Sequence, residues 1–174
     1  RRWEDAELAR LRAAGKSPKN DAWKSKYVEP ERPLAMELPE LPEGWCWTYA
    51  DALWWDADYG ISQRCESAAV GPPVFRIPNV QDERLDLSEL KYATAPAELP
   101  PEGGLEPGDF VFIRSNGSRS LIGRGALTVA PFEEPHFFAS YLVRLRLVDL
   151  NPFPRWFAAA WSSEVVRHQL LRAA

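Results

Sequence analysis

Sixteen prolines spread over 174 residues are the feature that most limits how this chain folds. Proline fixes φ and lacks an N–H group, so it interrupts the interior of helices and of paired strands. Together with ten glycines, the prolines favour short elements and many turns over a helix bundle. The hydrophobic content of 45 % is nevertheless sufficient to fill a core. We therefore expect a mixed, β-rich α+β domain with short helices.

The chain divides into three predicted parts. Residues 1–37 combine a charged helix, predicted over 1–14, with a proline-rich linker that we expect to be extended and semi-rigid. Residues 38–152 are predicted to form the compact domain, and residues 153–174 have the apolar period of an amphipathic helix. The only methionine is Met36, so we expect this sequence to be part of a longer protein.

Apolar runs and alternation locate the predicted strands. The clearest strand is 110–114, with 120–130 as its antiparallel partner and residues 116–117, Asn-Gly, as the hairpin turn. Residues 140–148 alternate in the manner of a half-buried strand. A short strand is also expected at 45–47, with its tryptophans in the core.

Cysteine and histidine are scarce. Cys46, Cys65, His136 and His168 are too few and too scattered for a typical zinc site or a disulfide framework, so no metal site is expected. A reducing, cytoplasmic compartment is the expected location. No apolar run reaches the length of a membrane span, and no signal peptide is visible, so we expect no membrane association.

Motifs of catalysis and cofactor binding are absent from the sequence. There is no G-x-S-x-G nucleophile elbow, no phosphate-binding loop and no G-x-G-x-x-G. Residues 151–154, "NPFP", loosely resemble the Asn-Pro-Pro-aromatic motif of amino-methyltransferases. The second proline is displaced and no glycine-rich cofactor loop precedes the motif, so we interpret it as a break before the terminal helix. We expect no enzymatic activity and no cofactor in this chain.

Polar side chains gather at three predicted turns, and these side chains are of the types that read nucleic acid. Arginine bonds guanine in a bidentate manner, asparagine bonds adenine, and serine bonds bases or phosphates. The net charge is −4, but residues 110–174 carry eight basic and four acidic residues. Each cluster by itself is also typical of a solvated turn. The candidate DNA-binding residues are Ser62, Gln63, Arg64, Arg76, Asn79, Arg114, Ser115, Asn116, Ser118 and Arg119.

Five stretches in order add a family resemblance to this interpretation. They are "LPELPEGWCW", "YGISQR", "PVFRIPNVQDERLDLSELKY", "GDFVFIRSNGSRSLIGRGAL" and "FFASYLVRLRLVD". Over about residues 38–172, the chain resembles the target recognition domain of the DNA specificity (S) subunit of type I restriction–modification systems. The residues before it are similar to the helix and linker that precede such a domain.

The resemblance implies a non-catalytic module that reads one half of a bipartite target in double-stranded DNA. Modification subunits would methylate adenine with S-adenosylmethionine, and a restriction subunit would use ATP and Mg²⁺ to translocate and cleave DNA. The terminal helix would be the start of a long, conserved spacer helix that contacts its counterpart and the modification subunit. Packing within the same domain is the alternative for its apolar face. The candidate partner-interface residues are Trp156, Phe157, Trp161 and Leu170.

Two other function classes stay open from the sequence. One is a protein–protein adaptor whose tryptophans and terminal helix bind a partner without DNA contact. The other is a small hydrolase or methyltransferase with an unrecognised site. The dependence of any DNA binding on salt concentration distinguishes the first from a DNA-reading module.

Overall fold

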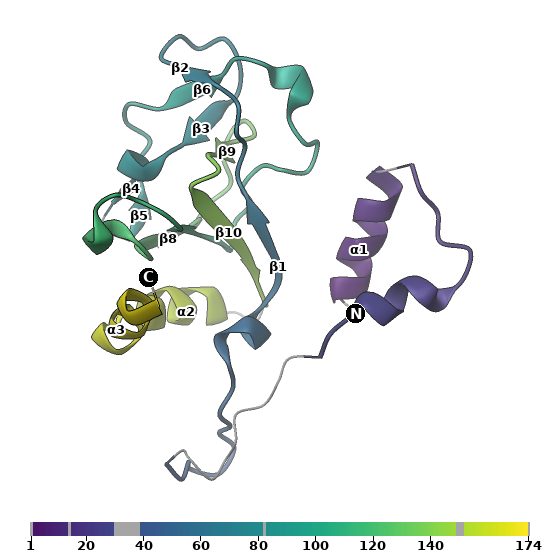
Figure 1. Ribbon diagram of the computed structural model, residues 1–174, viewed down its shortest axis with the longest axis vertical. Coiled ribbons are helices and arrows are strands. Elements are labelled where there is room, and N and C mark those ends of the chain that lie inside the picture. The colour runs from purple at the N-terminus through teal and green to yellow at the C-terminus, as the bar shows by residue number, and fades with distance from the viewer. Residues whose placement is uncertain (1, 14, 30–38, 82, 149–151, 174) are drawn as a thin grey trace. The chain divides into compact units, whose positions relative to one another are not determined.

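The computed structural model describes residues 2–13, 15–29, 39–81, 83–148 and 152–173. The chain forms two compact units, Arg1–Asp56 and Ala57–Ala174. Figure 1 shows the order of the elements along the chain. The boundary predicted between residues 37 and 38 lies outside the described residues, so the three-part division stays a prediction. Within the described residues, no helix is long and apolar enough to cross a membrane.

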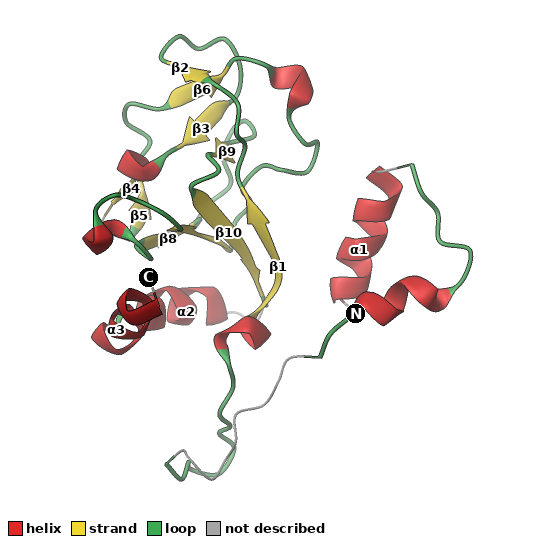
Figure 2. Ribbon diagram, in the orientation of Figure 1, coloured by secondary structure: helices red, strands yellow, loops and turns green. Residues whose placement is uncertain are grey.

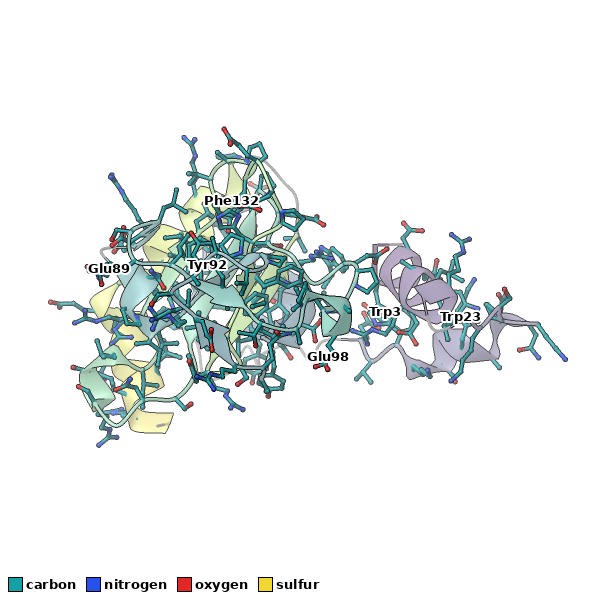
Figure 3. All side chains as sticks on the ribbon, turned by 90° about the horizontal axis from the view of Figure 1, so that it is seen from above. Trp3, Trp23, Glu89, Tyr92, Glu98 and Phe132 are labelled. Carbon is teal, nitrogen blue, oxygen red and sulfur yellow. The ribbon has the colours of Figure 1, made fainter. Side chains whose placement is uncertain are left out.

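The first unit begins with helix α1 (Arg2–Ala13), as predicted from its periodicity. The segment after it is not simply extended, because a 3₁₀ helix forms at Asp21–Lys26. The ring of Trp3 stacks on Trp23 with a centroid distance of 6.0 Å and lies 5.3 Å from the ring of Tyr27. Figure 3 shows the two tryptophans close together. This aromatic contact brings the start of the predicted linker back onto α1, which the proline content did not reveal.

The strand predicted at 45–47 does not form, so that prediction is wrong. Trp45 is 71 % exposed, Trp47 is 43 % exposed, and the backbone there has no regular structure. Alternation indicates a strand only where a neighbouring strand can pair, whereas the indole of Trp47 donates to the carbonyl of Pro39 at 2.9 Å. A 3₁₀ helix follows at Ala50–Leu53, and the strand β1 begins only after it, at Trp54.

The first sheet of the second unit is built around the apolar run that the sequence singled out. Its strands, in spatial order, are β1 (Trp54–Tyr59), β10 (Leu142–Leu147), β7 (Asp109–Ile113) and β8 (Gly125–Leu127). β7 is antiparallel to both neighbours, with Ile113 opposite Leu142 and Phe110 opposite Leu127. The predicted strand and its pairing partner are therefore confirmed.

The tight turn predicted between β7 and β8 is not formed. Gly117 does not have the positive φ that an Asn-Gly hairpin turn requires. Residues 114–124, named here the β7–β8 loop, instead include a 3₁₀ helix at Arg119–Leu121. The connection is thus an irregular loop with its own side-chain contacts.

A second sheet and a short hairpin complete the second unit. The sheet has the order β2 (Cys65–Glu66), β6 (Lys91–Ala93), β3 (Pro73–Phe75) and β9 (Phe137–Phe138), and the hairpin consists of β4 (Val80–Gln81) and β5 (Arg84–Leu85). Phe75 and Phe138 join Val111, Ile113 and Leu142 in one buried cluster. Figure 2 shows short strands separated by long loops. The predicted mixed α+β class with short elements is confirmed.

β10 is buried on both faces, which corrects the half-buried strand expected at 140–148. Arg144 is only 2 % exposed. Its guanidinium donates to the carboxylate of Asp58 and to the carbonyl of Gly104, both at 3.4 Å, and lies over the ring of Phe138. A buried arginine is tolerated because these partners offset the loss of water.

The terminal segment forms two helices where one continuous helix was predicted. They are α2 (Phe153–Ser162) and α3 (Glu164–Ala173). Ser163 has an extended ψ of 151°, and its hydroxyl accepts from the amide of Val166 at 3.4 Å in the manner of an N-cap. α2 packs against β7 and β8, and Figure 1 shows α3 folded beside α2. Residue 151, the first of the break predicted at 151–154, lies outside the described residues.

Candidate nucleic-acid interface

Three segments that are distant in sequence meet at one end of the first sheet. They are the end of β1, the end of β7 and the start of β10. The amide of Ile61 donates to the carbonyl of Phe138 at 2.8 Å, and the amide of Arg114 donates to the carbonyl of Tyr141 at 2.9 Å. A Cβ atom on Gly60 would lie 2.1 Å from the carbonyl oxygen of Phe138, so glycine is required for this approach. We call this region, residues 59–62 with 114–118 and Tyr141, the polar edge.

Arg114 is the cation of the polar edge. Its guanidinium carbon lies 4.8 Å from the centroid of the Tyr59 ring, a distance typical of a cation–π contact. Tyr59 is 64 % exposed, so the contact orients the arginine head while leaving its N–H groups in solvent. Within the part of the chain that the structure describes, Arg114 forms no ion pair, and its donors are therefore available to an external acceptor.

The start of the β7–β8 loop presents further donors and acceptors. Ser115 is exposed. The side-chain oxygen of Asn116 accepts from the amide of Ser118 at 2.6 Å, which holds the turn. The hydroxyls of Ser118 and Ser120 lie 3.1 Å apart on the surface. The side chain of Arg119 donates to the carbonyl of Leu171 in α3 and is exposed. Four of the predicted residues, at 115, 116, 118 and 119, therefore lie in one loop next to Arg114.

The cluster at 62–64 only partly joins the polar edge. Ser62 is exposed next to Ile61, and Arg64 is exposed with its Nε 3.2 Å from the carboxylate of Glu66. Gln63 is different, because its side chain accepts from the amide of Ala95 at 2.8 Å and donates to the carbonyl of the same residue at 3.3 Å. A bidentate base contact by Gln63 would have to break both bonds.

Arg76 and Asn79 hold the protein's own backbone. Asn79 is 2 % exposed, and its side chain accepts from the amide of Arg76 and donates to the carbonyls of Asp86 and Ser88. Arg76 is half-buried and donates to the carbonyl of Glu89 at 3.1 Å. Both amide atoms of Asn79 are satisfied and shielded, so a DNA contact by Asn79 would have to break these bonds, and its role in DNA binding stays a prediction.

The predicted partner interface is divided between buried and exposed side chains. Phe157 and Trp161 are 3 % and 8 % exposed and pack on Phe110 of β7 with centroid distances of 5.2 and 5.4 Å. The chain's own β7 therefore covers both side chains, and a partner contact by either residue stays a prediction. Trp156 is 56 % exposed, and half-buried Leu170 approaches the backbone of the β7–β8 loop. An interface at Trp156 stays a prediction.

Sequence reasoning missed Tyr59 and Tyr141 as members of the polar edge. Tyr59 begins the quoted stretch "YGISQR", so an aromatic residue before a glycine at a strand end was the available signal. Tyr141 contributes its carbonyl and a ring that is 40 % exposed. Nothing in its local sequence separates it from a strand residue with an inward side chain.

Acidic, histidine and cysteine side chains of the described residues form no group of three that could hold a metal ion. A groove in the second unit has a volume of about 750 Å³ and is lined mainly by apolar side chains of β5, α2 and residues 127–132.

Comparison with known proteins finds a similarity to a subunit of a restriction enzyme. The chain is 24 % identical over 112 residues to the type I restriction enzyme EcoKI specificity subunit of Escherichia coli K12. The match covers 64 % of this chain and 24 % of that subunit, so it spans about a quarter of the relative's length. No protein-family model matches the chain. The similarity supports a relationship to specificity subunits and does not assign the chain to one domain of such a subunit.

Proposed function

We propose that this chain recognises a specific sequence in double-stranded DNA as a non-catalytic part of a type I restriction–modification specificity subunit. It reads one half of a bipartite target. Modification subunits, which bring S-adenosylmethionine, and a restriction subunit, which brings ATP and Mg²⁺, would act at the DNA that this chain selects. The observation that carries the proposal is the similarity to a specificity subunit.

The chemistry of the polar edge agrees with this role. Arg114 has a fixed position over Tyr59 and unused donors, as bidentate recognition of guanine requires. Exposed hydroxyls at 115, 118 and 120 can bond base edges or phosphates. Arg114 and Ser115 directly follow the end of β7, so their backbone is held by the sheet and the loss of entropy on binding is reduced for these two residues.

Charge limits the strength of the proposed binding. The net charge is −4, and the basic excess is confined to residues 110–174. Of the basic residues there, Arg144 is buried and Arg146 is paired with Glu106 at 3.0 Å. The six other arginines of this segment act against a net charge of −4, so the chain should neutralise few phosphates and its binding should depend only shallowly on salt concentration.

Replacement of Arg114 by alanine should reduce discrimination between the target and a single-base variant by about 1–3 kcal/mol. The reason is the loss of two donors that match a base edge. The measurement is the affinity for target and variant duplexes at a fixed salt concentration, after the target has been selected from random DNA.

Two further variants separate base reading from charge. Arg114→Lys keeps the charge but not the bidentate geometry, so it should lose discrimination while keeping affinity for random DNA. Arg155→Ala removes an exposed arginine of α2 and should leave discrimination unchanged. Unchanged discrimination in both Arg114 variants would remove Arg114 from the interface.

A map of methylated adenines in the host genome tests the function as a whole. Cells with the full gene are compared with cells whose gene lacks the residues of this chain. Loss of methylation at one bipartite sequence is the expected result and would identify the target. An unchanged map, together with no selection of any sequence from random duplexes by the wild-type chain, would contradict the proposal.

A protein–protein adaptor is the second candidate function. Exposed aromatic side chains at 45, 47 and 49 in the first unit favour it, because large exposed apolar groups often mark partner surfaces. An adaptor should not bind random duplex DNA at any salt concentration from about 50 to 200 mM. Detectable binding that weakens with added salt would support the DNA-reading function instead.

A further inference from the structure

The second half of the β7–β8 loop is held by side chains of α2 and α3. The indole of Trp161 donates to the carbonyl of Gly123 at 2.8 Å. The guanidinium of Arg167 donates to the carbonyl of Ile122 at 2.7 Å and to the carbonyl of Ser120 at 3.2 Å. Three carbonyl groups of this irregular backbone therefore have donors from the terminal helices.

Arg167 binds two carbonyl groups of the loop with a single planar side chain. Its planar guanidinium carries two Nη groups at a fixed separation, so bonding Ser120 and Ile122 together fixes the distance between their carbonyls. A lysine has a single nitrogen on a flexible stem and cannot impose the same constraint. The contact is partly buried, which strengthens it relative to a bond in water.

Packing places α3 directly on the loop backbone. Gly123 has a φ of +74°, and a Cβ atom there would lie 2.9 Å from Leu170 Cδ1 and 3.0 Å from Arg167 Nη1. In the opposite direction, Arg119 of the loop donates to the carbonyl of Leu171. Contacts therefore run both ways between α3 and the loop, which are joined by hydrogen bonds and by close packing at Gly123.

The contacts from α2 and α3 bind the backbone of the loop and leave serine side chains of the proposed recognition surface exposed. Ser118 and Ser120 keep their hydroxyls exposed, and Ser120 is the residue whose carbonyl Arg167 binds. Arg124 adds a further bond to the same carbonyl at 3.3 Å. The backbone at Ser120 is thus held by Arg167 of α3 and by Arg124, and the Ser120 hydroxyl lies 3.1 Å from that of Ser118.

We propose that Arg167 is a positioning residue that sets the shape of the β7–β8 loop and thereby the sequence preference of the polar edge. The inference rests on the proposed DNA-reading function. Arg167 acts through the backbone of 120–122 and does not itself read a base. α3 therefore helps to set the shape of the recognition surface. A partner that moves α3 would change the DNA sequence that the loop prefers.

The test uses the 174-residue chain and three variants. Arg167→Ala removes both bonds, Arg167→Lys keeps the charge, and Arg172→Ala removes an exposed arginine of the same helix as a matched control. Hydrogen exchange is measured at the loop amides of Ile122, Gly123 and Arg124, which bond to loop and β7 carbonyls. The sequence preference of each protein is measured by selection from random duplex DNA.

Both Arg167 variants should exchange the loop amides about tenfold faster or more, with unchanged exchange in β10 as the sign that the fold is intact. Their preference for the selected sequence should fall about tenfold, while affinity for random DNA falls less in Arg167→Lys than in Arg167→Ala. Arg172→Ala should match the wild type in loop exchange and in preference.

The outcomes separate this inference from the function on which it rests. If the wild type selects a sequence and Arg167→Lys keeps the same preference or the same slow loop exchange, the positioning role is wrong. Arg167 would then act only through its charge. If the wild type itself selects no sequence, the proposed function fails and the inference fails with it.

Discussion

Replacement of Trp161 by alanine should lower the free energy of unfolding by about 3–5 kcal/mol, the usual cost of truncating a large core aromatic. The Trp161 ring lies 5.4 Å from that of Phe110, 5.1 Å from that of Phe112 and 5.5 Å from that of Phe157. The variant loses these contacts and leaves the carbonyl of Gly123 without its indole donor. Urea-induced unfolding, followed by far-ultraviolet circular dichroism, measures the difference.

The same helix supplies a matched control. Trp156 is 56 % exposed, so Trp156→Ala should change the free energy of unfolding by no more than about 0.5 kcal/mol. Trp161→Phe keeps most of the apolar contact and should cost about 1–2 kcal/mol, mainly through the lost hydrogen bond. Equal costs for Trp156→Ala and Trp161→Ala would mean that α2 does not pack on β7 by this face.

The terminal helices illustrate what periodicity can and cannot predict. The spacing of Phe157 and Trp161 correctly identified an apolar helical face. Periodicity does not say what covers that face, so a partner subunit and the chain's own β7 were equally consistent with it. The break at Ser163 has a local signal, because a serine followed by Glu164 is typical of a helix start.

The strands were predicted best where burial is strongest. The continuous apolar run of β7 indicated a central strand because both of its faces are covered, by the main cluster and by α2. At 45–47 the same alternation of tryptophans had no pairing strand, and the prediction failed. Strand pairing is a long-range property, and a local pattern does not contain it.

The candidate site was predictable in its chemistry and not in its contacts. The sequence placed polar side chains at the end of β7, where Arg114 is indeed exposed. It could not separate Arg114 from Asn79 or Gln63, whose amides bind backbone groups of their own domain. Backbone carbonyls of the kind that these amides bind are present in every loop. Only the folded backbone therefore decides which polar side chains already have hydrogen-bond partners.

The stability of the fold should fall as pH rises from about 4 to about 6, because of Asp109. This carboxyl is 3 % exposed at the start of β7, and burial raises its pKa from 3.8 to about 6. The amide of Glu106, which donates at 2.9 Å, and the charges of Arg144 and Arg146 lower the pKa and only partly oppose burial. The folded state therefore prefers the protonated carboxyl more strongly than the unfolded state does.

The decrease in the free energy of unfolding with rising pH follows from proton linkage. Between the two pKa values the folded chain binds more protons at Asp109 than the unfolded chain, so the free energy of unfolding decreases with rising pH. At about 1.4 kcal/mol per pKa unit, the shift corresponds to a loss of about 3 kcal/mol by pH 7. Below about pH 4 the stabilisation is fully present, because the carboxyl is protonated in both states.

Asp109→Asn isolates this contribution, because the amide resembles the protonated carboxyl and does not titrate. Unfolding in urea is measured for both proteins at several pH values from 4 to 7.5. The wild type should lose about 3 kcal/mol relative to the variant across this range, with most of the change between pH 4 and 6. Curves that stay parallel would show that Arg146, whose Nε lies 3.5 Å from the carboxylate, stabilises the charged form enough to cancel the effect of burial. The ion pair between Asp109 and Arg146 would then offset the cost of burying the carboxylate without adding net stability to the fold.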